Sequence, residues 1–311
     1  MTRTLTFDVD GRDWPNRATS RFVAAAGLAW HVQQTGQGPE ILLIHGTGAS
    51  THSFEGLVDV LAPHFSLTLC DLPGHAFTDQ VATSDMALPR LAALVGDLLG
   101  VVGCRPEFIV GHSAGAAIAA RMVIDGRVAP PRLIAGINAA LLPFPGVARW
   151  LFPPMARLIA TTGLPARVLA WHAGREGAVA KVLAGTGSSP PQRSLSFYER
   201  LIANPDHVKA TLDMMAMWDL DALQRDLPRL SCPLLLIACS GDQAVPAEDA
   251  WRVRDICSTA GVRFVRALGH LAHEEDPGLI GEIIRTATAD PQAAIGATRT
   301  AAAASRVRQR G

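Results

Sequence analysis

The chain has 311 residues, of which 49% are hydrophobic, and its formal net charge at pH 7 is zero. This length can bury the core of one large α/β domain with an insertion, or of two small domains. The balanced charge and the lack of a basic stripe in the sequence argue against a nucleic-acid partner. The first residues are charged where a signal peptide is apolar, and no apolar run reaches the length of a membrane span, so we expect neither export nor a membrane span.

The cysteines are scattered along the chain without a Cys-x-x-Cys spacing. This pattern is typical of reduced core thiols in a cytoplasmic protein, and it disfavours a zinc site or a disulfide framework. The histidines and acidic residues show no metal-ligand spacing such as His-Glu-x-x-His. We therefore expect a cytoplasmic protein without a metal or other cofactor.

Residues 1–19 predict an irregular N-terminal arm, which Trp14 attaches to the body of the protein. Two short strands follow at 21–25 and 28–34, joined by a glycine turn. The continuous apolar run at 40–44 predicts a strand buried on both faces, as in a mostly parallel sheet.

A glycine-rich loop, His45-Gly46-Thr47-Gly48-Ala49-Ser50, comes directly after that strand. A loop at this position can direct a backbone N–H into a cleft. It is too short for a phosphate-binding loop and lacks the lysine of that motif. Taken alone, the loop fits an ordinary strand-to-helix connection equally well. Together with the motif described next, it predicts an oxyanion hole with the N–H of Thr47 as one donor.

The Gly-x-Ser-x-Gly motif at 111–115 lies between a β-prone run and an Ala-rich run, which predicts a strand, a sharp turn and a helix. In such a nucleophile elbow, Ser113 is strained and projects above the end of the strand. Gly111 and Gly115 stand where a Cβ would collide with a neighbouring strand or helix. The N–H of Ala114 is the second expected oxyanion donor, at a helix N-terminus that favours negative charge. The alternative is a glycine-rich turn with a passive serine.

Strands and helices alternate with short connections over 20–138 and again over 231–288. This alternation predicts an α/β fold with a mostly parallel, doubly wound sheet and helices on both faces. The remaining expected elements are helices at 54–61, 86–102, 248–258 and 278–288 and strands at 66–70, 132–137, 233–239 and 262–268.

Residues 139–230 show no buried strand, and prolines divide them into short helices, so we expect a helical lid above the sheet. Met214, Met217 and Trp218 share one helical face by their spacing. They form either the core of the lid or the wall of an apolar substrate pocket, since methionine adapts to irregular ligands. Residues 289–311 are Ala-rich without an apolar period and predict a disordered tail or a frayed helix.

Acyl transfer by a serine needs a base to take its proton and a carboxylate to orient that base. Ser113, Asp242 and His270 meet this need. Asp242 and His270 each follow a predicted strand, so both should lie at the carboxyl edge of the sheet with the elbow. Two alternatives stay open. Asp242 could be a simple turn residue, and His273 could be the base in place of His270.

Other titratable residues lie near this edge in sequence. His45, His75 and His112 have no carboxylate partner that the sequence identifies. The acidic run 274–276 precedes the last predicted helix, where negative charge favours the helix N-terminus, so we interpret these residues as capping residues.

Several motifs together resemble the α/β-hydrolase superfamily over residues 20–288. They are His45-Gly46, Asp71-Leu72-Pro73-Gly74-His75, Gly111-His112-Ser113-Ala114-Gly115, Asp242-x-x-Val245-Pro246 and Gly269-His270. One departure is Ala76, where glycine is commoner, and it puts the local turn in doubt.

Over nearly its whole length the chain also resembles the BchO family, α/β-hydrolase-like proteins of bacteriochlorophyll synthesis that are often described as magnesium-chelatase accessory subunits. The matching stretches are Asp13-Trp14-Pro15-Asn16-Arg17, Trp30-His31-Val32-Gln33, residues 45–53 and 111–117, and Met214-Met215-Ala216-Met217-Trp218-Asp219-Leu220.

This resemblance implies a role near magnesium insertion into protoporphyrin IX, with a bulky apolar substrate such as a tetrapyrrole and magnesium-chelatase subunits as partners. Two functions follow. The first is a serine hydrolase acting on an ester or similar acyl bond through Ser113, His270 and Asp242. The second is a non-catalytic porphyrin-binding or chelatase accessory factor on a hydrolase scaffold. Three well-separated residues in triad order favour the hydrolase.

Overall fold

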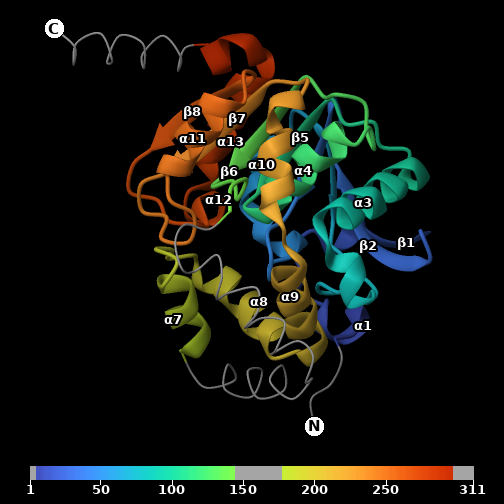
Figure 1. Cartoon of the computed structure of the whole chain (residues 1–311). Helices are drawn as coiled ribbons and strands as arrows, with labels where there is room; N and C mark the ends of the chain where they lie inside the picture. The colour runs from blue at the N-terminus through green and yellow to red at the C-terminus, as the bar shows by residue number, and fades with distance from the viewer. Residues whose placement is uncertain (1–4, 144–176, 297–311) are drawn as a thin grey trace, which may run out of the picture.

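The computed structural model describes residues 5–143 and 177–296. An eight-stranded sheet has the order β1-β2-β4-β3-β5-β6-β7-β8 (Figure 1). β2 is antiparallel to both β1 and β4, and all other neighbours are parallel. The predicted α/β fold with a mostly parallel sheet is confirmed. From β1 to β8, the strands are Ser20–Ala25, Leu28–Thr35, Glu40–Ile44, Ser66–Cys70, Phe108–His112, Leu133–Ile137, Leu234–Cys239 and Ala260–Val265.

Helices cover both faces of the sheet (Figure 1). α3 (Leu88–Val102), α4 (Ala114–Ile124) and α11 (Glu248–Ile256) pack on one face. α2 (Glu55–Leu61) and α13 (Pro277–Ala289) pack on the other, and the short α12 (Ala272–Glu275) precedes α13. None of the helices in the described part of the chain is both long and apolar enough to cross a membrane.

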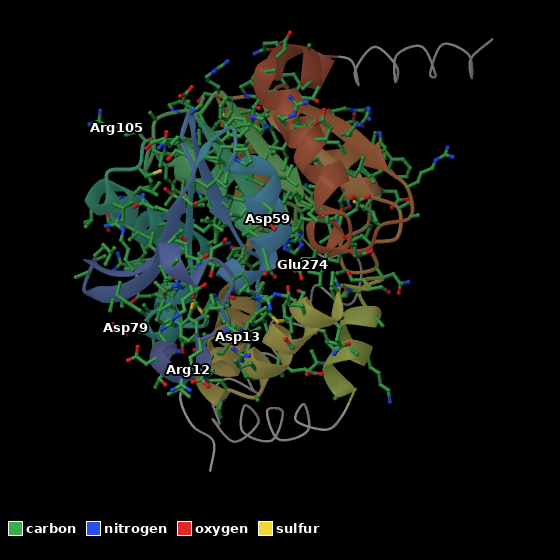
Figure 2. The ribbon with its side chains drawn as sticks, turned by 180° about the vertical axis from the view of Figure 1, so that it is seen from behind. Arg12, Asp13, Asp59, Asp79, Arg105 and Glu274 are labelled. Atoms are coloured by element: carbon green, nitrogen blue, oxygen red, sulfur yellow. The ribbon has the colours of Figure 1, made fainter. Side chains whose placement is uncertain are left out.

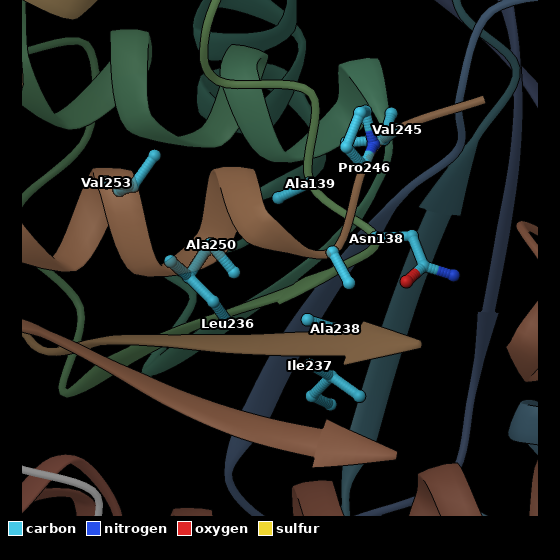
Figure 3. A pocket seen from close by; sticks show the side chains of 10 residues that line it. Asn138, Ala139, Leu236, Ile237, Ala238, Val245, Pro246, Ala250 and Val253 are labelled. Atoms are coloured by element: carbon cyan, nitrogen blue, oxygen red, sulfur yellow. The ribbon is translucent and has the colours of Figure 1, made fainter. Parts of the chain in front are cut away.

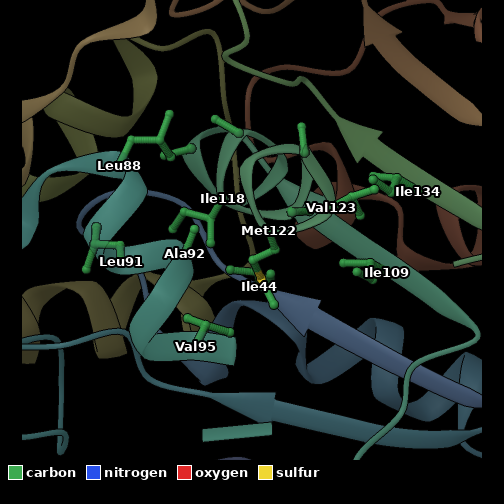
Figure 4. Close-up of a cluster of buried hydrophobic side chains, with 14 of the residues drawn as sticks. Ile44, Leu88, Leu91, Ala92, Val95, Ile109, Ile118, Met122, Val123 and Ile134 are labelled. Carbon is green, nitrogen blue, oxygen red and sulfur yellow. The ribbon is translucent and has the colours of Figure 1, made fainter. Parts of the chain in front are cut away.

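The core behind the elbow forms where α3 and α4 meet the sheet (Figure 4). Ile44 of β3, Ile109 of β5 and Ile134 of β6 share a cluster with Ile118 and Met122 of α4, and all are 0% exposed. Burying one such side chain stabilises the fold by about 1.5–3 kcal/mol. The helix that follows Ser113 is therefore firmly fixed on the sheet.

Three helices lie across the carboxyl end of the sheet, at the bottom of Figure 1. They are α7 (Ala178–Ala184), α8 (Gln192–Ile202) and α9 (Pro205–Met217), within the segment expected to form the lid. Residues 144–176 of that segment lie outside the described residues.

α10 (Leu220–Asp226) falls within the segment expected to form the lid, but it does not lie with the other lid helices. It packs beside α4, where Arg121 donates a hydrogen bond to Asp226 at 2.8 Å and Leu223 is buried in the main core. An apolar face and an ion pair thus hold this helix on the sheet domain and not above it.

β8 ends at Val265 and not at Leu268 as predicted. Ala267 has a φ of 72°, and its N–H donates to Ser240 Oγ at 2.9 Å, so the extended strand cannot continue through it. The residues after Val265 form the loop that leads to His270.

The N-terminal arm contains α1 (Phe7–Asp10), and Trp14 attaches it to the body as predicted. Trp14 is 2% exposed, packs against Phe197 of α8, and donates from its indole N–H to Thr51 Oγ1 at 3.1 Å. The carboxylate of Asp13 accepts two hydrogen bonds from Arg200 of α8, at 2.7 and 3.0 Å. The arm therefore holds α8 against the sheet domain.

The chain after α13 is helical in its described part. Residues 291–296 form a further helical turn, where we expected disorder or a frayed helix. Ile295 is buried, and Asp290 accepts the N–H of Ala293 at 3.0 Å. Short 3-10 helices complete the described elements at Arg17–Thr19, Thr51–Phe54, Thr83–Met86 and Leu227–Arg229.

Candidate active site

Ser113 occupies the sharp turn between β5 and α4. Its φ of 51° and ψ of −116° cost a residue with a side chain about 1–3 kcal/mol. A Cβ on Gly111 would lie 2.4 Å from the amide nitrogen of Ala116, and a Cβ on Gly115 would lie 2.1 Å from the carbonyl oxygen of Ile44. The prediction that both positions need glycine is confirmed.

The loop after β3 lies beside the elbow. A Cβ on Gly46 would be 3.1 Å from the Cβ of Ser113. Within the described ranges, no protein acceptor takes the N–H of Thr47 or of Ala114. Ala114 is the first residue of α4, where a helix leaves its amides without an internal partner. Both predicted donors therefore lack a protein acceptor among the described residues.

His270 and Asp242 are hydrogen bonded, with 2.8 Å between Nδ1 and Oδ2. The Asp242 side chain is 0% exposed and that of His270 is 12% exposed. The other oxygen of Asp242 accepts the N–H groups of Ala244 and Val245, at 2.7 and 2.9 Å. Asp242 therefore stabilises its own turn and also fixes the imidazole of His270.

The backbone of His270 is held by two side chains. His112 Nε2 donates to the His270 carbonyl oxygen at 3.0 Å, and Asn138 Nδ2 donates to the same oxygen at 3.0 Å. Asn138 also donates to Gly269 O at 2.9 Å and accepts the N–H of Cys239 at 3.0 Å. Asn138 is not among the predicted site residues. Its position as the first polar residue after a buried strand, at the edge that carries the site, was the available signal.

Ser113 and His270 lie at the same edge of the sheet, and the rings of His112 and His270 are 4.7 Å apart. In the described part of the protein, Ser113 forms hydrogen bonds through its backbone alone, so its hydroxyl is not bonded to His270 in this conformation. Such a bond often forms at full strength only when substrate is bound.

His273, the alternative base, is fully buried against His112 and Phe54. Neither ring nitrogen has a hydrogen-bond partner among the described residues, and Glu274 lies 3.8 Å from Nε2. Burial lowers the pKa of His273 to about 3, which keeps the ring neutral. The geometry therefore favours His270 as the base.

Glu274 lies between the sheet domain and the lid helices (Figure 2). Its carboxyl group accepts hydrogen bonds from Ser194 and from the hydroxyl of Tyr198, the latter at 2.7 Å, and both donors are on α8. Burial raises the pKa of Glu274 to about 7. The capping interpretation is wrong for Glu274. It is confirmed for Asp276, which accepts the N–H of Leu279 at 2.9 Å.

Among the described lid methionines, Met214 contacts the loop that holds Thr47. It is fully buried, and its sulfur accepts a hydrogen bond from the Thr47 hydroxyl at 3.5 Å. Met217 and Trp218 are half-buried and pack against the main core. α9 ends at Met217, and Trp218 is its C-cap in an extended conformation, so the prediction of one shared helical face is wrong for Trp218. Met214 and Met217 lie on α9, and Met214 brings this helix into contact with the loop that holds Thr47.

His45 is a buried histidine at the same edge. Its Nδ1 donates to the Gly46 carbonyl oxygen at 2.8 Å, and its Nε2 accepts the N–H of Leu72 at 2.9 Å. Burial lowers its pKa, so the ring is neutral. Among the described residues, no group of three or more His, Cys, Asp or Glu side chains is placed to hold a metal ion.

A small cavity lies behind the Asp242 turn, between the ends of β6 and β7 and the start of α11 (Figure 3). Asn138 is the one polar side chain in its lining. The lining residues are Asn138, Ala139, Leu236, Ile237, Ala238, Val245, Pro246, Ala247, Ala250 and Val253.

Comparison with known proteins places this geometry in context. The model of a family described as the alpha/beta hydrolase family matches residues 41–282. The magnesium-chelatase 30 kDa subunit of Rhodobacter capsulatus is 36% identical, over 88% of this chain and 95% of that protein. A pimeloyl-[acyl-carrier protein] methyl ester esterase of Xanthomonas oryzae pv. oryzae is 30% identical, over 70% of this chain and 82% of that protein. The structure of an esterase from Exiguobacterium antarcticum has a TM-score of 0.71 at 14% identity, over 86% of this chain and 99% of that one, and shares the fold.

Proposed function

Because the chain belongs to the alpha/beta hydrolase family, we propose that it is a serine hydrolase that cleaves an ester or similar acyl bond of a bulky apolar substrate. The observation that carries this proposal is the 2.8 Å hydrogen bond between His270 and a buried Asp242. A strained serine in an elbow and two free amides at the same edge support it.

The reaction proceeds in two stages. Ser113 Oγ attacks the acyl carbon, and its proton passes to His270 Nε2, while Asp242 stabilises the imidazolium. The N–H groups of Thr47 and Ala114 bind the oxyanion, and loss of one such donor typically costs about 3–4 kcal/mol. His270 then protonates the leaving alcohol. A water molecule, deprotonated by His270, releases the acid from the acyl-enzyme.

The substrate we propose is an ester of a tetrapyrrole, used in bacteriochlorophyll synthesis in the cytoplasm. Two relatives support this choice, since one is named as a magnesium-chelatase subunit and the other as a methyl ester esterase. We propose that Met217 and Trp218, which are half-buried, contribute to the apolar surface that receives it, whereas Met214 is fully buried against the loop that holds Thr47.

The relative named as a magnesium-chelatase subunit, which is matched over 95% of its length, favours a second function. In this alternative, the protein binds a porphyrin or docks on the chelatase, and the triad residues are inherited without being used. The hydroxyl of Ser113, which is not bonded to His270 in the described structure, is compatible with this alternative.

Reaction with a fluorophosphonate probe separates the two functions. The purified protein should be labelled rapidly, and Ser113→Ala and His270→Ala should abolish labelling. Ser196→Ala changes a partly exposed serine of α8, and His64→Ala changes an exposed histidine. Both serve as matched controls and should be labelled like the unsubstituted protein. A folded protein that is not labelled, or that is labelled equally after Ser113→Ala, contradicts the hydrolase. Porphyrin titration and binding to purified chelatase subunits, unchanged by Ser113→Ala, would then support the accessory function.

A further inference from the structure

One face of the lid helix α9 rests on the loop that holds Thr47. His207 Nε2 donates to the carbonyl oxygen of Gly48 at 3.1 Å. The methyl group of Thr211 packs against Gly48, since a Cβ added to that glycine would be 3.3 Å from it. Met214 accepts the hydroxyl of Thr47. Positions 207, 211 and 214 follow the i, i+4, i+7 spacing of a single helical face.

The hydrogen bonds of this loop fix three successive peptide groups. The carbonyl of Gly46 accepts from His45 Nδ1 at 2.8 Å and from the N–H of Ala49 at 3.2 Å. Because a trans peptide directs its N–H opposite to its carbonyl, these bonds set the direction of the Thr47 N–H. The N–H of Gly48 is bound by His75 at 3.3 Å, and the carbonyl of Gly48 is the group that His207 holds.

His207 also reaches the turn after β4. Its Nδ1 accepts the N–H of Ala76 at 3.1 Å, so the proton must lie on Nε2, the nitrogen that faces Gly48. His207 is buried, and its two hydrogen bonds link the lid to two loops of the sheet domain. Through its bond to Gly48, a residue of the lid fixes the third of the three peptide groups.

We propose that His207 is a positioning residue for the oxyanion hole, and that the lid helix α9 holds the N–H of Thr47 toward the substrate's acyl oxygen. This inference rests on the proposed hydrolase function. In it the lid builds part of the reaction centre, whereas a lid that merely covers the site would leave the oxyanion hole intact when His207 is changed.

Two substitutions at this position separate the two hydrogen bonds. In His207→Gln, the amide nitrogen takes the place of Nε2 and can still donate to Gly48. In His207→Asn, the shorter side chain can accept from Ala76 but cannot reach Gly48. Hydrolysis of a short p-nitrophenyl ester is measured for both, with active sites counted by fluorophosphonate titration.

We expect kcat per active site to fall about 10- to 100-fold in His207→Asn with KM nearly unchanged, because the oxyanion exists in the transition state and not in the bound substrate. His207→Gln should recover most of this loss. A merely structural role would reduce the number of active sites and leave kcat per site unchanged, which would overturn the proposal.

The failure of this proposal is distinct from the failure of the hydrolase function. If the unsubstituted protein neither reacts with the probe nor cleaves the ester, both proposals fail. If it does both and His207→Asn equals it in kcat, only the positioning role fails. Should His207→Asn not fold, Met214→Leu removes the acceptor of the Thr47 hydroxyl at similar volume. It should lower kcat at unchanged KM, and an unchanged kcat would overturn the proposal.

Discussion

Asn138 holds the backbone carbonyl of His270 from the end of β6, with 3.0 Å between its amide nitrogen and that oxygen. Asn138→Asp keeps the shape but turns a carboxylate oxygen toward the carbonyls of Gly269 and His270. We expect a loss of about 1–3 kcal/mol in the free energy of unfolding and a slower reaction with fluorophosphonate. Urea denaturation and labelling rates measure the two effects.

The control for this substitution is Asn16→Ala. Asn16 is another asparagine in the left-handed region, with a φ of 55°, but it lies in the N-terminal arm and makes no contact with His270. It should destabilise the protein without slowing the labelling of the folded fraction. Equal labelling rates for Asn138→Asp and Asn16→Ala would contradict a role of Asn138 in positioning His270.

Backbone strain at Ser113 can be measured by comparing two inactive variants. Ser113→Gly and Ser113→Ala both remove the hydroxyl, but glycine adopts a φ of 51° and a ψ of −116° more easily than alanine. We expect the glycine variant to be more stable by about 1 kcal/mol, since relief of strain exceeds the entropy cost of glycine. A glycine variant less stable than the alanine variant in urea would show that the elbow stores no strain.

Ala76 has a φ of 43°, so the turn adopts a left-handed conformation despite the missing glycine. The departure that put this turn in doubt is therefore a local strain and not a different turn. Ala76→Gly should raise the free energy of unfolding by about 1 kcal/mol. Ala24→Gly, at an exposed position of β1, should lower it instead. A loss of stability at position 76 as well would mean that the partly buried methyl group of Ala76 contributes more than the strain costs.

The pH dependence of stability should reveal Glu274, whose pKa rises from 4.5 to about 7 on folding. Between these values the folded protein keeps a proton that the unfolded chain releases. The contribution of Glu274 to the free energy of unfolding is therefore complete below pH 4.5 and is lost as pH rises to 7, by about 1.4 kcal/mol per pH unit and about 3 kcal/mol in all. The free energy of unfolding of Glu274→Gln, measured in urea, should therefore rise by this amount relative to that of the unsubstituted protein between pH 4.5 and pH 8.

The exposed Glu248 provides the comparison for this experiment. Glu248→Gln removes one negative charge at an exposed position, so it measures the effect of that loss alone on the pH profile of stability. If the profile of Glu274→Gln matches that of Glu248→Gln at every pH, then Glu274 is not protonated on folding.

The sequence predicted the sheet well because buried parallel strands are short apolar runs between turn residues. β3 and β4 have the predicted limits. β8 was displaced because the left-handed Ala267, which carries no sequence signal, ends it early. Ser113 directly follows β5, whereas Asp242 and His270 lie in the loops after β7 and β8. All three were recognisable because each comes after a predicted strand at the carboxyl edge of the sheet.

The supporting residues of the site could not be found in the same way. The contact of Asn138 with His270 spans 132 positions in the chain, and that of His207 with Gly48 spans 159. Such contacts depend on how the lid and the last loop pack on the sheet, and local sequence patterns do not predict that packing.

The pairing of Asp13 with Arg200 has a consequence for biosynthesis. The arm is synthesised before α8, because its ion-pair partner Arg200 lies 187 positions after Asp13. Until then Trp14 also lacks the ring of Phe197 against which it packs. While β1 to β6 are synthesised, the arm therefore lacks the side chains of α8 that hold it. The arm can dock on the lid only after α8 has been synthesised.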